Sequence, residues 1–201
     1  MSVVKIDPAN PDKEIIAAAA KIVREGGLVI FPTETVYGIA ANLLDEKALK
    51  RLYTVKGRPG DKPFTVHISD TKMVRDMGCV ITGTAKKLTD RFWPGPLTII
   101  LKSGEGKKTG FRMPANKIAL ELIKASGVPV VAPSANLSGR PAPATAGETM
   151  ADLDGKVDMI IDGGRTEVRL ESTVVDLTVD PLKVLRAGAI KEADLLKAID
   201  E

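Results

Sequence analysis

Two short polar tracts hold the side chains of this sequence that are best suited to chemistry. The first is Lys56-Gly57-Arg58, which offers two cations, and the second is Ser134-Ala135-Asn136, which offers a hydroxyl and an amide. Each tract follows a predicted helix or strand and so falls where a loop begins. Cations beside small polar groups, with little acid–base equipment elsewhere, favour the binding of a polyanion such as a nucleoside triphosphate. The chemistry would then depend on positioning and charge stabilisation.

Each of these side chains also has a purely structural interpretation. Lys56 and Arg58 stand at the predicted C-terminal end of a helix, where cations interact favourably with the helix dipole. Ser134 and Asn136 can form Ser and Asx turns. They also follow an apolar strand, at the end where open α/β sheets bind ligands. The residues alone leave both interpretations open.

Four more candidates are ordinary when taken singly. His67 fits a buried core histidine, Arg112 a surface salt bridge, and Ser172 the start of a strand, while Arg186 carries no signal of its own. One histidine and one cysteine exclude a His cluster, a Cys-rich metal site and an intramolecular disulfide. The P-loop, dinucleotide-binding, zinc-protease and nucleophile-elbow motifs are absent. A nucleotide site here must be of a less common kind.

The composition is typical of an α/β protein with an aliphatic core. The chain has 201 residues, of which 44% are hydrophobic and 3% aromatic, and one domain over residues 1–201 is expected. A net charge of +3 is too small to indicate a nucleic-acid binder by itself. The basic residues gather at 50–62 and 102–117, which points to a discrete anion site. Without a signal peptide or a bilayer-spanning run, a soluble, cytoplasmic protein without a membrane partner is expected.

Apolar runs separated by Gly and Pro predict alternating helices and strands. Helices are expected from a cap at Asn10 to Gly26, from Asp45 to about Lys56, and near the C-terminus from Lys191, with a short one starting at Asp70 and others at 85–92 and 117–125. The strands are predicted at 28–31, 64–68, 97–101, 128–132, 159–162, 173–177 and 183–185. Segments 102–110 and 138–146 are predicted as loops, the second one over the site. This order favours a twisted mixed parallel and antiparallel sheet with helices on its faces.

Seven tracts, taken in order, resemble the YrdC family. They are PTETVYG (32–38), KGRP (56–59), VHI (66–68), WPGPLT (93–98), APSANLSG (132–139), STVVD (172–176) and LRAG (185–188). The resemblance implies a YrdC-like fold and an L-threonylcarbamoyladenylate synthase, which is a nucleotidyltransferase. Such enzymes join L-threonine, bicarbonate and ATP into threonylcarbamoyl-AMP and release pyrophosphate. A separate complex then transfers the threonylcarbamoyl group to tRNA.

The resemblance also assigns roles to residues. The nucleotide-binding positions are Lys56, Arg58, Lys62, Ser134, Asn136 and Arg186, and the catalytic ones among them are Lys56, Arg58, Ser134 and Asn136. The threonine-binding positions are Thr35, His67, Arg112 and Ser172. Arginines suit phosphate and carboxylate groups, and hydroxyls suit a small polar side chain. Mg²⁺ is expected through the ATP phosphates, so no protein metal site is predicted.

Two other functions fit parts of this pattern. A non-catalytic RNA-binding module would use the two basic clusters, and weak RNA binding is possible in either case; however, aromatic residues for base stacking are scarce. A carbamoyl-adenylate enzyme of the kind used in hydrogenase maturation has a similar domain, but within a much longer chain. The sequence also departs from one branch of the family, which carries a linker and a second, C-terminal domain.

Overall fold

The computed structural model describes residues 1–58, 60 and 63–200, and its strands form a single mixed sheet. The strand order within this part of the chain is β1-β8-β2-β3-β7-β4-β6-β5-β9-β10. The strands are β1 (Ser2–Lys5), β2 (Val29–Phe31), β3 (Gly38–Asn42), β4 (Val66–His67), β5 (Leu97–Lys102), β6 (Lys108–Arg112), β7 (Val130–Val131), β8 (Met159–Asp162), β9 (Thr173–Asp176) and β10 (Lys183–Arg186). Parallel pairs such as β2–β8 and β5–β9 occur in the same sheet as antiparallel pairs such as β2–β3 and β5–β6. The predicted mixed sheet is therefore confirmed.

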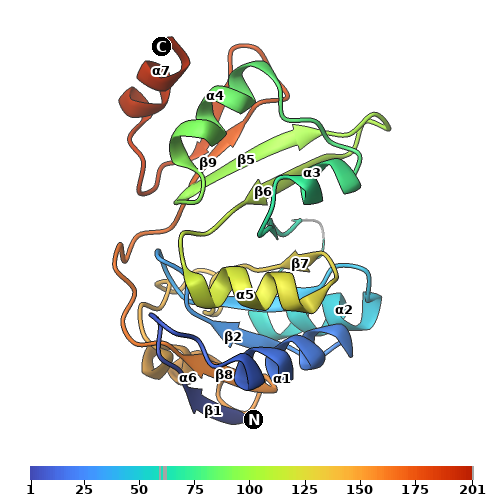
Figure 1. The fold of residues 1–201 in the computed structure, drawn as a ribbon, viewed down its shortest axis with the longest axis vertical. Coiled ribbons are helices and arrows are strands. Elements are labelled where there is room, and N and C mark those ends of the chain that lie inside the picture. Colours follow the sequence, from blue (N-terminus) through green and yellow to red (C-terminus); the bar gives the residue numbers. More distant parts are fainter. Residues whose placement is uncertain (59, 61–62, 201) are drawn as a thin grey trace.

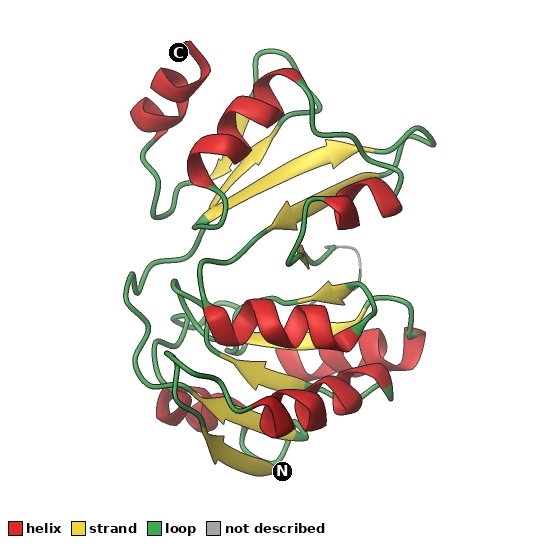
Figure 2. Ribbon diagram, viewed as in Figure 1, coloured by secondary structure: helices red, strands yellow, loops and turns green. Residues whose placement is uncertain are grey.

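Helices cover this sheet in groups (Figures 1 and 2). They are α1 (Lys13–Arg24), α2 (Glu46–Lys56), α3 (Lys72–Asp76), α4 (Gly83–Phe92), α5 (Lys117–Ser126), α6 (Ala146–Leu153) and α7 (Glu192–Asp200). In the lower half of Figure 1, α1 and α5 lie over one face of the strands, and α2 and α6 lie over the other. In the upper half, α3, α4 and α7 lie beside β5, β6 and β9. The single-domain organisation of residues 1–201 stays a prediction.

Side-chain alternation along the strands explains why helices can cover both faces. In β2, Val29 and Phe31 pack with α1 and α5, whereas Ile30 belongs to the core beneath α2. In β5, Leu97 and Ile99 belong to that same large core cluster, whereas Thr98 faces a pocket. Successive strand residues point to opposite faces, so a strand can serve a core and a pocket together. The pocket side of β5 and its neighbours is the part of the sheet that the helices leave open.

Helix caps fix where the predicted helices begin and end. The Asp12 carboxylate accepts a hydrogen bond of 2.8 Å from the Glu14 backbone N–H, so α1 is capped two residues after the predicted Asn10. The Asp45 carboxylate caps α2 as predicted. At the other end of α2, Gly57 adopts a left-handed conformation with φ of 57°. This turn takes the chain out of the helix and sends Arg58 toward the pocket.

Four elements were not predicted from the sequence: strands β1, β3 and β6 and helix α6. Strand β6 begins at Lys108, inside the predicted loop 102–110, and β4 and β7 are shorter than the strands predicted at 64–68 and 128–132. Strand β3 is buried on both faces, so it lacks the alternation that marks a half-buried strand. Strand β1 is held by its parallel pairing with β8, a tertiary contact that no local pattern shows.

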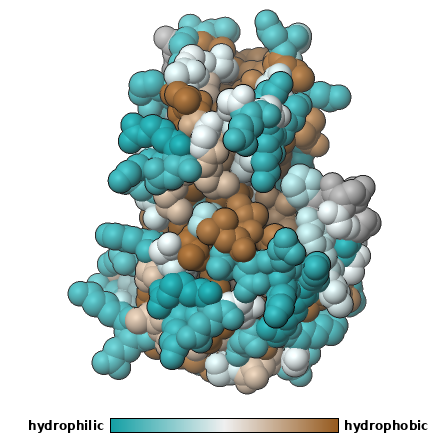
Figure 3. All heavy atoms as spheres, turned by 90° about the vertical axis from the view of Figure 1, so that its right-hand side faces the viewer, coloured by the Kyte–Doolittle hydropathy of each residue, from teal (hydrophilic) through white to brown (hydrophobic). Residues whose placement is uncertain are grey.

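Two further observations concern the polarity of the outer surface and the lengths of the helices. The face drawn in Figure 3 is largely hydrophilic, with an apolar area near its middle. Leu44 and Val80 are among the large apolar side chains that remain exposed. Within the described residues, none of the helices combines the length and the apolar character needed to cross a bilayer.

Candidate functional site

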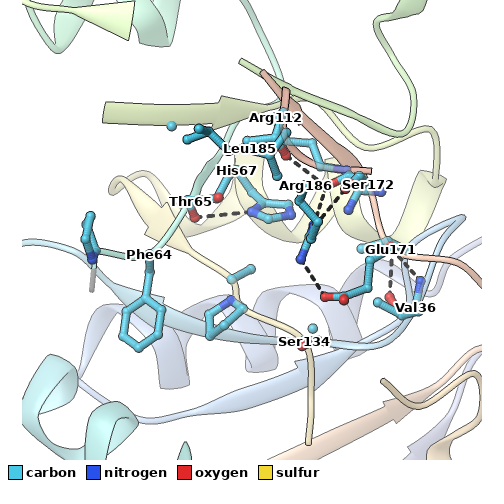
Figure 4. Close-up of a pocket in the computed structure, with 18 of the residues that line it drawn as sticks. Val36, Phe64, Thr65, His67, Arg112, Ser134, Glu171, Ser172, Leu185 and Arg186 are labelled. Carbon is cyan, nitrogen blue, oxygen red and sulfur yellow. Dashed lines mark hydrogen bonds and ion pairs between the residues drawn. The ribbon is translucent and has the colours of Figure 1, made fainter. Parts of the chain in front are cut away.

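A pocket of about 270 Å³ lies against the open side of the upper strands (Figure 4). Its walls come from β4, β5, β6, β9 and β10 on one side, and from the segment between β2 and β3 and the loop after β7 on the other. Ser134 makes an isolated bridge with Gly38, which brings these last two segments together. The pocket thus gathers the ends of segments that are far apart in the sequence, as ligand sites in α/β sheets commonly do.

Arg112 is the most deeply buried cation of this pocket. Its guanidinium Nη2 donates a 2.7 Å hydrogen bond to Thr35 Oγ1 and lies 2.9 Å from Glu34 Oε1. The Glu34 approach is an ion pair without hydrogen-bond alignment, because neither carboxylate oxygen has a hydrogen-bond partner. Burial lowers the pKa of Arg112, and Glu34 opposes that shift. Arg112 Nε is also buried without a partner, so the protein leaves part of the hydrogen-bonding capacity of the guanidinium unused.

His67 lies beside Arg112 because β4 and β6 are parallel neighbours with these two residues in register. Burial, followed by the charge of Arg112, lowers the pKa of His67 to about 3. The ring is therefore neutral near pH 7, and Nδ1 lies 3.4 Å from the Thr65 carbonyl oxygen. If Nδ1 carries the proton, it donates to that carbonyl and Nε2 becomes an acceptor. A neutral histidine in this place suits a hydroxyl or amine donor better than an anion.

This buried histidine makes stability fall in acid. The folded-state pKa of about 3 lies below the ordinary 6.5. As the pH falls from 6.5 toward 3, this histidine therefore binds a proton in the unfolded chain but stays neutral in the folded chain. Between pH 7 and pH 5 the wild type should lose about 2 kcal/mol more unfolding free energy than His67→Gln. Urea unfolding at both pH values measures this difference. Parallel pH profiles for the two proteins would contradict it.

Ser172 and Arg186 lie at β9 and β10, on the same side of the pocket as His67 and Arg112. The Ser172 hydroxyl lies 2.9 Å from Thr98 Oγ1 and accepts a 2.9 Å hydrogen bond from Arg186 Nη2. Arg186 also donates from Nε to the Ser172 carbonyl oxygen at 3.0 Å and from Nη1 to Glu171 at 2.7 Å. Figure 4 shows Arg186 between His67 and Glu171. Ser172, which was predicted to bind threonine, and Arg186, which was predicted to bind the nucleotide, are thus joined directly by hydrogen bonds.

Lys56 lies behind the pocket wall, not on it. Its side chain is buried, and its ammonium donates to the Ser134 carbonyl at 2.6 Å and to the Asn136 carbonyl at 2.8 Å, with the Asn136 amide oxygen at 3.3 Å. Burial, followed by the charge of Arg58, lowers the pKa of Lys56 to about 8. Three donors meet three protein oxygens, so Lys56 fastens the loop that carries Ser134.

Asn136 belongs to the same hydrogen-bond network. Its amide nitrogen donates to the carbonyl oxygens of Leu137 and Arg140, at 3.1 and 2.6 Å. Asp152 on α6 accepts from the Leu137 N–H and pairs with Arg140. Neither Lys56 nor Asn136 lines the pocket. Direct phosphate contacts by these two residues stay predictions, while the bonds drawn here give them a positioning role.

Ser134 and Arg58 do line the pocket. The Arg58 guanidinium lies 5.0 Å from the centre of the Phe64 ring and donates to the Pro63 carbonyl at 3.3 Å. Its Nε atom has no hydrogen-bond partner. The aromatic contact holds the cation in place while leaving donors for an anionic ligand. The predicted Lys62 falls outside the described residues, and the predicted loop 138–146 contributes no residue to the pocket wall.

Three site residues were missed from the sequence: Glu34, Thr98 and Glu171. Glu34 and Thr98 sit inside quoted motifs, but nothing local shows that their side chains turn toward Arg112 and Ser172. Glu171 directly precedes the STVVD tract, and its carboxylate reaches the pocket. The described residues hold no group of three His, Cys, Asp or Glu side chains that could bind a metal. Mg²⁺ bound through ATP phosphates stays a prediction.

The chain is similar to proteins of known name along most of its length. A family model described as telomere recombination, and named for Sua5, YciO and YrdC, matches residues 21–188. A threonylcarbamoyl-AMP synthase of Pyrococcus abyssi is 47% identical over 195 residues, which cover 92% of this chain and 57% of that protein. The Bacillus subtilis threonylcarbamoyl-AMP synthase is 44% identical over 199 residues, covering 94% of this chain and 58% of that protein.

A solved structure shares the fold closely. The crystal structure of Pyrococcus abyssi Sua5 complexed with L-threonine matches with a TM-score of 0.93 and 43% sequence identity. The match covers 98% of this chain and 60% of that one. The chain therefore spans a little over half the length of the curated relatives named here.

Proposed function

The chain belongs to the Sua5/YciO/YrdC family, and on that premise we propose that it is a threonylcarbamoyl-AMP synthase. Its substrates would be L-threonine, bicarbonate and ATP, and its second product pyrophosphate. The observation that carries this proposal is the cluster of Arg112, His67 and Ser172 in one small pocket. A buried guanidinium with a spare donor, a neutral imidazole and a hydroxyl together suit a small hydroxy amino acid.

The amino-acid end of the pocket would work through Arg112. Arg112 lines the pocket and can pair with the substrate carboxylate, while its Nη2 stays fixed by Thr35 and Glu34. A guanidinium that is already held in place loses little freedom when the ligand arrives. The hydroxyls of Thr98 and Ser172 are buried nearby and can recognise the threonine side chain. A site of this kind rejects analogues that lack the hydroxyl.

The nucleotide end would work through Arg58 and Ser134. Arg58 and Ser134 both line the pocket, so both can contact phosphate oxygens. The α-ammonium of threonine would first lose a proton to solvent, and the free amine would attack bicarbonate, which loses water, to give N-carboxy-threonine. A carboxylate oxygen of that species would then attack the α-phosphorus of ATP, and pyrophosphate would leave with the bonding electrons. Mg²⁺ carried by the phosphates would help to neutralise their charge.

The tRNA pathway and the cellular place follow from the same proposal. The product is a mixed anhydride, which reacts readily with water, so a separate threonylcarbamoyl-transfer complex must take it up and modify tRNA. We place this work in the cytoplasm, where ATP and tRNA are both available. No direct RNA contact of this chain is required for the adenylate-forming step.

The proposal predicts pyrophosphate release that depends on two co-substrates. With ATP and Mg²⁺, release should need both L-threonine and bicarbonate, and L-serine should support it far less well because its side chain lacks the methyl group. A coupled pyrophosphate assay measures this, and mass spectrometry identifies the adenylate. Release that ignores threonine would contradict the proposal. Absent release with intact tRNA binding would instead favour a non-catalytic RNA-binding module.

A further inference from the structure

Glu171 is the only carboxylate among the described residues that line the pocket. The described cations there are Arg58, Arg112 and Arg186, so this part of the wall carries one negative charge against three positive ones. Most of the proposed substrate groups are anions, namely the triphosphate, bicarbonate and the amino-acid carboxylate. An acid in such a pocket weakens the binding of all of them, since like charges repel. Its presence therefore calls for a cationic partner.

Arg186 is the present partner of Glu171, but it does not depend on that bond. The ion pair has a Nη1–Oε1 distance of 2.7 Å, and its two side chains are 41% and 37% exposed. Arg186 is already oriented by the Ser172 carbonyl oxygen and hydroxyl. A half-exposed ion pair is also easily exchanged, because water screens much of its attraction. The Glu171–Arg186 ion pair can therefore break while Ser172 still holds the guanidinium by its hydrogen bonds.

The Glu171 backbone is held firmly, so the position from which its side chain extends is fixed. The Ala189 N–H donates a 3.0 Å hydrogen bond to the Glu171 carbonyl oxygen. A Cβ atom added at Gly188 would stand 2.4 Å from that same oxygen, which shows how closely the two backbones approach. Ser172, the next residue, supplies a hydroxyl to the amino-acid end of the pocket. The carboxylate thus stands beside the wall where the amino acid would bind.

An α-amino acid carries a carboxylate and an ammonium on one carbon, so its site needs a cation and an anion close together. Arg112 supplies the cation. Its charge is within electrostatic range of Glu171, which opposes the lowering of the Arg112 pKa. Glu34 is the other acid near Arg112, but it is 5% exposed, already paired and not part of the pocket wall. Glu171 is left as the described acid that a bound amino acid can reach.

We propose that Glu171 binds the α-ammonium group of the amino-acid substrate and exchanges Arg186 for it when that substrate enters. This inference rests on the proposed function and names a residue that selects amino acids over other hydroxy acids. The exchange also releases the Nη1 donor of Arg186 toward the nucleotide end of the pocket. Bound amino acid should therefore strengthen nucleotide binding, and by linkage the nucleotide should strengthen amino-acid binding equally.

The test compares L-threonine with 3-hydroxybutyrate, which is the same molecule without its amino group. Calorimetric titrations of wild type and Glu171→Gln are run without nucleotide and with EDTA, so that no Mg²⁺ can occupy the carboxylate. Wild type should prefer threonine by about tenfold or more, since a charge-assisted hydrogen bond is lost with the amine. In Glu171→Gln that preference should nearly vanish, because threonine binding weakens while 3-hydroxybutyrate binding does not.

The controls separate this inference from its alternatives. Glu167→Gln changes an exposed acid a few residues away and should leave both affinities unchanged. Unchanged threonine affinity in Glu171→Gln would overturn the inference. So would weaker binding of a non-hydrolysable ATP analogue alone, because Glu171 would then act only by positioning Arg186. A wild type that binds no threonine at all would overturn the proposed function itself, and the inference with it.

Discussion

Replacing Arg112 by lysine is expected to raise the KM for L-threonine by about 30-fold or more while the KM for ATP changes little, since truncating a buried, hydrogen-bonded charge pair costs roughly 2–5 kcal/mol. Arg112 Nη2 contacts Thr35 and Glu34, and the residue also lines the pocket in which the substrate carboxylate would bind. A lysine ammonium is a point charge and cannot span both sets of partners. Steady-state kinetics with each substrate varied in turn measure the two constants.

The conservative change is chosen because loss of the charge would leave a buried acid alone. Glu34 is 5% exposed, and an unpaired carboxylate there is expected to cost about 3–5 kcal/mol of stability. The double variant Arg112→Met with Glu34→Gln removes both charges and tests the site in a folded protein. Arg75→Lys on the exposed side of α3 is the matched control. Equal effects on both KM values, with normal melting, would contradict a threonine-specific role.

Much of the fold was predictable because its signals are local. The apolar runs at 28–31, 97–101 and 159–162 became β2, β5 and β8, with shifts of at most a residue or so at their ends. Asp45 and Gly57 bound α2 by capping and by a left-handed turn, both of which depend on neighbouring backbone only. The elements that were missed depend on distant partners. Strand β1, for example, exists through its pairing with β8.

The site was predictable in residue type and less so in role. The family resemblance singled out His67, Arg112 and Ser172, although Arg112 lies outside the quoted motifs, and the fold does gather these three in one pocket. What no motif conveys is the depth of a side chain or the backbone oxygens around it. Lys56 looked like a phosphate-binding cation because its charge is visible in the sequence. The sequence does not show the carbonyl oxygens of Ser134 and Asn136, which accept hydrogen bonds from its ammonium group.

Replacing Lys56 by methionine is accordingly expected to lower turnover about tenfold or more by loosening the loop at 134–140, because each buried acceptor left without a donor costs about 1–3 kcal/mol. Methionine keeps most of the length and apolar stem but donates no hydrogen bond. The acceptors that lose their donor are the Ser134 carbonyl and both oxygens of Asn136. Hydrogen exchange of the loop amides, with and without an ATP analogue, measures the loosening directly.

The exchange data decide between the two roles of Lys56. A positioning residue should speed amide exchange at 134–140 in the free variant, before any nucleotide is added, because the bonds that are lost lie within the protein. A phosphate-binding residue should leave free-state exchange unchanged and weaken only the binding of the ATP analogue. Lys50 lies on the same helix, and its side chain is 80% exposed. Lys50→Met therefore controls for the loss of one positive charge and should resemble wild type. Fast exchange in Lys56→Met alone would assign the lysine to the loop, and unchanged exchange would return it to the nucleotide.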